Sequence, residues 1–197
     1  MLESKASGQN RRGKGRTMLN EVFDWLDAGV VSIICVVLIF TFGFRMVGIV
    51  GDSMENTLFS GDRVIISSVN YTPTAGDIVV ISRNYTNAEY VTDTQHEPII
   101  KRIIATEGQK VDIDFNRGVV YVDGHPLSEP YAKTFTTSKK DVEFPLVVKP
   151  GHVFVLGDNR AVSLDSRSSD IGQVDVRYIL GKAIYKVFPV DEFGEIE

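Results

Sequence analysis

The stretch PIIKRIIAT, residues 98–106, surrounds an adjacent lysine and arginine with four isoleucines. A short run of β-branched residues bounded by polar residues predicts a β-strand. Alternate side chains of a strand lie on the same face, so Lys101 shares its face with Ile99 and Ile103. Because lysine is rarely buried without a partner, Lys101 is either a solubilising residue on an edge strand or a buried amine with a function.

Similar runs follow one another along most of the remaining chain, separated by glycine, proline, asparagine and aspartate. They read DRVIISSV, GDIVVIS, KVDIDF, GVVYVDG, HVFVLGD and KAIYKVFPV. Short strands between turn residues are typical of antiparallel sheets and small barrels, and no strong helical periodicity follows residue 50. The sequence therefore predicts a mainly β domain, with a tight Asp-Gly turn at residues 123–124.

The longest apolar stretch is AGVVSIICVVLIFTFGF, residues 28–44, which contains no charged side chain. A helix needs about 17–25 apolar residues to cross a bilayer, and the stretch reaches residue 48 if Arg45 extends its charge toward water. It exceeds the about 7–15 apolar residues of a signal peptide, and no A-x-A cleavage site follows it. We therefore expect residues 28–48 to form a retained membrane anchor.

Basic residues precede this stretch within a polar N-terminal segment, residues 1–20, that we expect to be disordered. They are Arg11, Arg12, Lys14 and Arg16. The positive-inside rule then places residues 1–27 in the cytoplasm and residues 45–197 outside the membrane.

The composition argues against several functional classes. The net charge of −5 argues against nucleic-acid binding, which requires a basic domain or face. The single cysteine, Cys35, permits no intramolecular disulfide and matches no metal-ligand spacing. The three histidines form no H-E-x-x-H motif, so zinc proteolysis is unsupported and we expect no cofactor.

Three polar motifs contain residues suited to catalysis. GDSMENTL, residues 51–58, contains Ser53 but departs from the G-x-S-x-G elbow because Glu55 replaces the second glycine. Lys101 can accept a proton if burial keeps it neutral, whereas an arginine stays protonated. GDNRAVSLDSR, residues 157–167, follows an apolar strand. Taken singly, these motifs are a turn serine, an edge-strand lysine and a polar surface loop.

In this order behind an apolar span, the motifs resemble those of the type I signal peptidases, which are membrane-anchored Ser/Lys serine proteases, in their single-span Gram-positive form. GDIVVIS, residues 76–82, is similar to a further motif of that family, and the resemblance covers roughly residues 20–190. It implies that Ser53 is the nucleophile and Lys101 the general base of an endopeptidase that removes signal peptides after small residues. The implied partners are translocated preproteins and the lipid bilayer.

The resemblance also implies supporting roles. Ser163 resembles the hydroxyl that orients the lysine, and Asp165 and Arg167 resemble an ion pair that shapes the loop. Asp158 is placed to pair with Arg102. Four apolar residues are the implied walls of shallow substrate pockets, namely Ile49, Met54, Leu58 and Ile100.

The family fold is an antiparallel β catalytic core that carries a smaller inserted β region and follows one transmembrane helix. The division expected for this chain is a cytoplasmic tail at 1–27, an anchor at 28–48, a core at 49–111 and 151–190, an inserted cap at 112–150, and a C-terminal tail at 191–197.

The chain departs from the family pattern at three places. Asn56 stands where a proline is usual, and we expect a looser turn because proline would fix φ. Gly51 replaces a serine found in some members, so the oxyanion is expected to rely on backbone N–H groups, chiefly that of Ser53. Ala161 and Val162 replace a polar pair.

Two alternatives stay open. A self-cleaving Ser/Lys protease of the SOS-repressor type shares the dyad and the core, but the apolar span and GDNRAVSLDSR argue against it. An inactive membrane-anchored binding homologue is favoured only by Asn56, and the presence of both Ser53 and Lys101 argues against it. A serine-reactive probe, compared between wild type and Ser53→Ala, distinguishes the enzyme from the binding protein.

Overall fold

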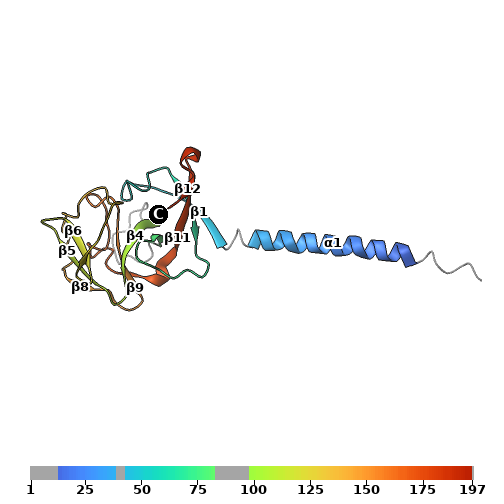
Figure 1. Cartoon of the computed structure of the whole chain (residues 1–197), viewed down its shortest axis with the longest axis horizontal. Coiled ribbons are helices and arrows are strands. Elements are labelled where there is room, and N and C mark those ends of the chain that lie inside the picture. The colour runs from blue at the N-terminus through green and yellow to red at the C-terminus, as the bar shows by residue number, and fades with distance from the viewer. Residues whose placement is uncertain (1–12, 39–42, 83–97, 197) are drawn as a thin grey trace, which may run out of the picture. The chain divides into compact units, whose positions relative to one another are not determined.

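A computed structural model describes residues 13–38, 43–82 and 98–196 (Figure 1). The chain divides into two units, residues 1–43 and residues 44–197. In the first unit, helix α1 spans Gly13–Leu38 and contains no proline. Apolar residues at 18, 22, 25 and 26 recur at helical spacing. Helix α1 begins at residue 13, so residues 13–20 are helical and the disorder expected for them is wrong.

The described part of the chain contains no helix with the length and apolar character needed to cross a membrane. Of the predicted anchor, residues 28–38 belong to α1, and residues 39–42 lie outside the described residues. Its last residues, Phe44–Gly48, form strand β1, which pairs with β2 (Arg63–Ser67). The predicted extension of a helical anchor to residue 48 is therefore wrong, because these residues join a sheet.

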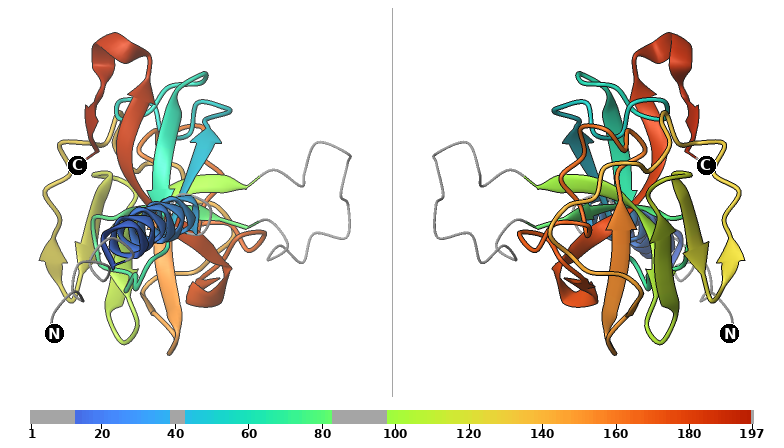
Figure 2. Two further views of the ribbon diagram at one scale, coloured as in Figure 1. Left: turned by 90° about the vertical axis from the view of Figure 1, so that its right-hand side faces the viewer. Right: turned by 90° about the vertical axis from the view of Figure 1, so that its left-hand side faces the viewer.

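The second unit is built on a sheet of eight strands, which Figure 2 shows from two opposite sides. Their order is β1-β2-β11-β3-β4-β9-β10, and β12 pairs with β11. The strands after β2 are β3 (Ile78–Ile81), β4 (Ile99–Thr106), β9 (His152–Leu156), β10 (Val174–Asp175), β11 (Ile179–Phe188) and β12 (Gly194–Glu195). Every pairing is antiparallel, which confirms the predicted mainly β antiparallel core.

A second sheet of four strands lies between β4 and β9 in the chain and has the order β7-β6-β5-β8. These strands are β5 (Lys110–Asp114), β6 (Val119–Val122), β7 (His125–Pro126) and β8 (Leu146–Val147). Asp123 and Gly124 join β6 to β7 with positive φ angles, which matches the Asp-Gly hairpin turn expected there. Two 3₁₀ turns, η3 (Val176–Tyr178) and η4 (Val190–Glu192), flank β11.

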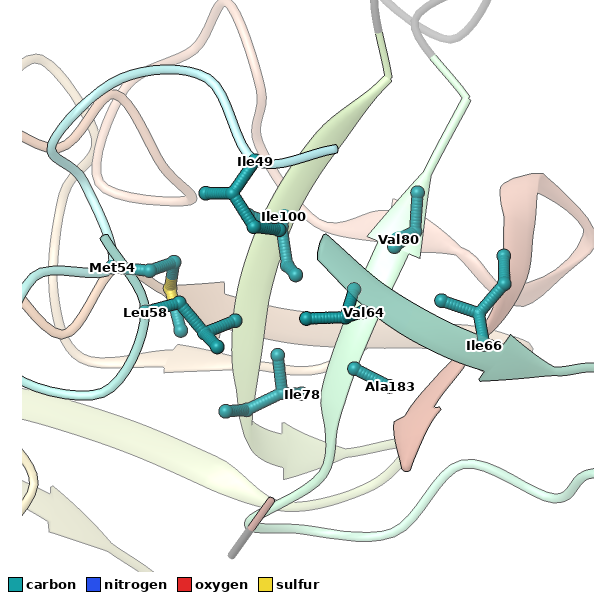
Figure 3. Packing of buried hydrophobic residues seen from close by; sticks show 9 residues of the cluster. All are labelled: Ile49, Met54, Leu58, Val64, Ile66, Ile78, Val80, Ile100 and Ala183. Atoms are coloured by element: carbon teal, nitrogen blue, oxygen red, sulfur yellow. The ribbon is translucent and has the colours of Figure 1, made fainter. Parts of the chain in front are cut away.

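Strand β4 contributes to three buried apolar clusters. Ile100 belongs to the cluster drawn in Figure 3, together with residues of β2, β3 and β11. Ile103 belongs to a second cluster, and Ile104 packs in a third that contains residues of both sheets. A polar side chain on β4 is therefore surrounded by protein and needs a specific partner.

Candidate active site

Lys101 occupies the middle of the large sheet. Its strand, β4, pairs with β3 on one side and with β9 on the other, and Lys101 lies opposite Val79 of β3. The lysine is only 3% exposed. The interpretation of Lys101 as a solubilising residue on an edge strand is therefore wrong.

The amine of Lys101 contacts the hydroxyl of Ser53. Nζ donates to Ser53 Oγ at 2.8 Å and to the carbonyl oxygen of Ile100 at 2.7 Å. Burial disfavours the ammonium form of a lysine and so favours the neutral amine that a base requires. The distance is short enough for direct proton transfer from the serine hydroxyl to the amine.

The turn that carries Ser53 is fixed by the core beneath it. Met54 and Leu58 are 1% and 0% exposed, and Figure 3 shows both side chains among the buried residues of the first cluster. The backbone N–H of Leu58 donates to the carbonyl of Met54 at 2.8 Å, which closes the turn. The burial of Met54 and Leu58 therefore fixes the position of Ser53, which is itself partly exposed.

A pocket of about 240 Å³ opens beside Ser53. Ile49 and Ile100, two of the four apolar residues expected in the substrate pockets, line it. The other two, Met54 and Leu58, do not line this pocket and instead support the serine turn from the core. The sequence could not separate the two residues that line the pocket from the two that support the serine turn, because all four are apolar. All four are also buried in the structure.

The loop 157–167 meets the serine turn through the backbone. The N–H of Asn159 donates to the carbonyl of Ser53 at 3.0 Å. A Cβ on Gly157 would lie 2.5 Å from that carbonyl oxygen and 2.2 Å from Ser163 Oγ. The glycine of the GDNR segment is therefore required for the close approach of the loop to Ser53.

Arg102 and Asp158 form a buried, bidentate ion pair. Nε and Nη2 of Arg102 donate to the two carboxylate oxygens at 3.0 and 2.9 Å, and both side chains are at most 3% exposed. Thr57 donates its hydroxyl to Asp158 at 2.6 Å, and the guanidinium lies 4.0 Å from the ring centre of Tyr131. The pair expected from the family resemblance is present, and it ties the serine turn to β4 and to the loop.

A second buried ion pair, between Asp165 and Arg167, closes the loop. Nε and Nη2 of Arg167 donate to the carboxylate at 2.8 and 2.9 Å, and neither side chain is exposed. Burial opposes ionisation of Asp165, but the hydrogen bonds and positive charge of Arg167, together with the backbone N–H of Gly157, lower the pKa of the carboxyl below its ordinary value. Arg167 also donates to the carbonyl of Arg160 at 2.7 Å, which holds the two ends of the loop together.

Ser163 does not make the expected hydrogen bond to the lysine. Its hydroxyl is fully buried and has no hydrogen-bond partner among the described residues. The Lys101 amine instead contacts Ser53 and the carbonyl of its own neighbour, Ile100. In this arrangement Ser163 lies against Gly157 and not against the Lys101 amine.

Residues of the inserted region support the site, and the sequence analysis missed them. Lys133 donates to the side chain of Glu55 at 2.6 Å, and its backbone N–H donates to the carbonyl of Asp158 at 2.8 Å. Buried Arg160 is paired with Glu129. These partners are separated by 25 to 78 residues, so no local spacing could have revealed them.

Asn56 has a left-handed backbone conformation, with φ of 98°. Its side-chain amide donates to the carbonyl of Tyr131 at 3.0 Å. The expectation of a looser turn is therefore wrong, because the amide attaches the turn to the inserted region.

We expect Asn56→Pro to lower the free energy of unfolding by more than about 1 kcal/mol, because proline fixes φ near about −65°. Asn56→Gly is the matched control, since it keeps the backbone conformation and removes only the amide. Urea unfolding of both variants in detergent measures the difference. Equal stability of the proline variant and the wild type would contradict the conformation described for residue 56.

The family model and the related sequences agree on one family. Residues 22–188 match the family model described as signal peptidase, peptidase S26. Signal peptidase I of Bacillus licheniformis is 30% identical and aligns over 93% of this chain and 98% of its own length. A probable signal peptidase I-1 of Synechocystis sp. is 37% identical and aligns over 74% of this chain and 71% of its own length. A crystal structure of a signal peptidase I from Enterococcus faecalis V583, 25% identical, covers 57% of this chain and 97% of its own length with a TM-score of 0.43.

Proposed function

Because the chain belongs to the signal peptidase family, peptidase S26, we propose that it removes signal peptides from translocated preproteins by means of a Ser53–Lys101 dyad. Members of this family are serine endopeptidases, and this chain is one of them. The observation that supports the dyad best is the 2.8 Å contact between Ser53 Oγ and an amine that is almost completely buried.

The proposed reaction has two acyl-transfer steps. Neutral Lys101 removes the proton from Ser53 Oγ while the oxygen attacks the carbonyl carbon of the scissile peptide. Backbone N–H groups, chiefly that of Ser53, stabilise the oxyanion. The C–N bond then breaks, and the Lys101 ammonium returns the proton to the leaving amine. Water, deprotonated by Lys101, hydrolyses the ester and regenerates the Ser53 hydroxyl.

The pocket beside Ser53 suits the end of a signal peptide. Ile49 and Ile100 give it apolar walls, Ser53 and Lys101 also line it, and its volume is about 240 Å³. We propose that an extended substrate places small side chains there, at the first and third positions before the scissile bond. Binding in this mode adds the substrate backbone to the edge of a strand.

We propose that the apolar segment before residue 45 anchors the enzyme in the lipid bilayer, with residues 1–27 in the cytoplasm and the catalytic domain outside. Four basic residues precede the apolar stretch, and the positive-inside rule retains them in the cytoplasm. This arrangement brings the dyad to the side of the membrane where translocated preproteins emerge.

One experiment tests both the activity and the orientation. Wall-less bacterial cells that produce the chain receive a membrane-impermeant signal-sequence peptide, and the new N-terminus of the product is sequenced. We expect cleavage by intact cells and none by cells that produce Ser53→Ala. Cleavage only after detergent is added would refute the orientation, and equal cleavage by Ser53→Ala would refute the serine mechanism.

A further inference from the structure

A second pocket, of about 360 Å³, also opens at the dyad. Ser53 and Lys101 line both pockets, together with Val50 and Ile99. The remaining walls differ: the first pocket includes the end of β1 and Val80, whereas the second includes Val162, Leu164 and Ile171. The two pockets therefore share Ser53 and Lys101 and differ in the rest of their walls.

The wall formed by the loop has an unusual burial pattern. Ser163 and Asp165 are fully buried, whereas the apolar side chains of Val162 and Leu164 are 62% and 39% exposed. The buried Asp165–Arg167 pair holds the loop in this arrangement. The loop therefore exposes two apolar side chains in the pocket that Ser53 lines. Exposed apolar surface in a pocket is a common feature of binding sites.

We propose that this second pocket binds the side chain of the first residue after the scissile bond and selects an apolar side chain there. The inference rests on the proposed function. A polypeptide whose preceding residues occupy the pocket of Ile49 and Ile100 continues past Ser53 toward walls that belong to the second pocket alone, among them Val162, Leu164 and Ile171. The exposed carboxylate of Asp52 also lines this second pocket and disfavours an acidic side chain in it.

The test uses the full chain in detergent and signal-sequence peptides that differ only in the first residue after the scissile bond. For wild type we expect kcat/KM to fall in the order Leu, Asn, Asp. Val162→Asn and Leu164→Asn should each reduce the ratio of the Leu rate to the Asn rate by about tenfold, the effect of losing one apolar contact in a pocket. Both positions are exposed, so the fold should tolerate these changes.

Val147→Asn is the matched control, because Val147 is 57% exposed on β8 and lines neither pocket. Its Leu to Asn ratio should equal that of wild type. Unchanged ratios of the Leu rate to the Asn rate in both loop variants would overturn the inference. If wild type cleaves none of the peptides, the proposed function fails and the inference fails with it. Normal cleavage with unaltered selectivity refutes the inference alone.

Discussion

Lys101→Arg should lose essentially all peptidase activity although it retains the positive charge. Guanidinium stays protonated at any working pH, so arginine cannot accept the Ser53 proton. General base catalysis contributes about 10²–10⁴-fold, and we expect at least that loss in kcat/KM on a soluble signal-sequence peptide. If Lys101 were only a structural cation in the sheet, the arginine variant would keep much of its activity.

The arginine variant needs a folding control, because Lys101 is buried and guanidinium is larger and differently shaped. Urea unfolding of the variant establishes whether the catalytic domain is intact. Lys110→Arg is the matched substitution, because Lys110 is exposed on β5 and outside the described pockets that contain Ser53. A folded Lys101→Arg enzyme with near-normal activity would exclude the Ser53–Lys101 dyad.

Asp165→Ala should destabilise the protein by about 3–5 kcal/mol, because it leaves the fully buried guanidinium of Arg167 without its carboxylate. Activity should fall as well, since the loop 157–167 contacts the serine turn. The chain offers a matched control with the same Asp-x-Arg spacing. Asp175 pairs with Arg177, whose side chain is 82% exposed, so Asp175→Ala should have a much smaller effect.

The Asp165–Arg167 pair also predicts that the stability of the protein depends on pH. Burial opposes ionisation of Asp165, but the hydrogen bonds and charge of Arg167, with the backbone N–H of Gly157, hold its pKa below the ordinary value in the folded protein. The resulting stabilisation is present above the unfolded-state pKa of about 3.9 and is lost as pH falls through the lower folded-state pKa. Urea unfolding should therefore show that the free energies of unfolding of wild type and Asp165→Ala differ less at acidic pH than at neutral pH. An Asp165→Ala protein as stable as wild type at neutral pH would contradict this structural role.

The β architecture could be predicted from the sequence because each strand is a local pattern of β-branched and aromatic residues between turn residues. The Asp123-Gly124 turn is an example, since the preference of this dipeptide for positive φ is intrinsic. The meeting of Ser53 with Lys101 is different. The two residues are 48 positions apart, and their local sequence also fits a turn residue and an edge-strand cation. Only the resemblance of the ordered motifs to a family brought them together.

The supports of the site could not be predicted, because they depend on tertiary packing. Tyr131 covers the Arg102 guanidinium and Lys133 reaches Glu55, yet the irregular segment that carries them has no signature. The burial of Met54 beneath the serine turn likewise follows from the sheet and not from its neighbours in the chain. The resemblance also implied a Ser163–Lys101 hydrogen bond that this structure does not contain.

The most direct test of the dyad is the rate at which a serine-reactive peptide probe acylates the full chain, measured by mass spectrometry at several pH values. The account predicts that the label lies on Ser53, and that its rate of formation in wild type rises with pH as Lys101 becomes neutral. Lys101→Arg should form no label at any of these pH values. Labelling of Lys101→Arg at the wild-type rate and with the wild-type pH profile, or modification of another serine instead, would contradict the assignment of Lys101 as the base that activates Ser53.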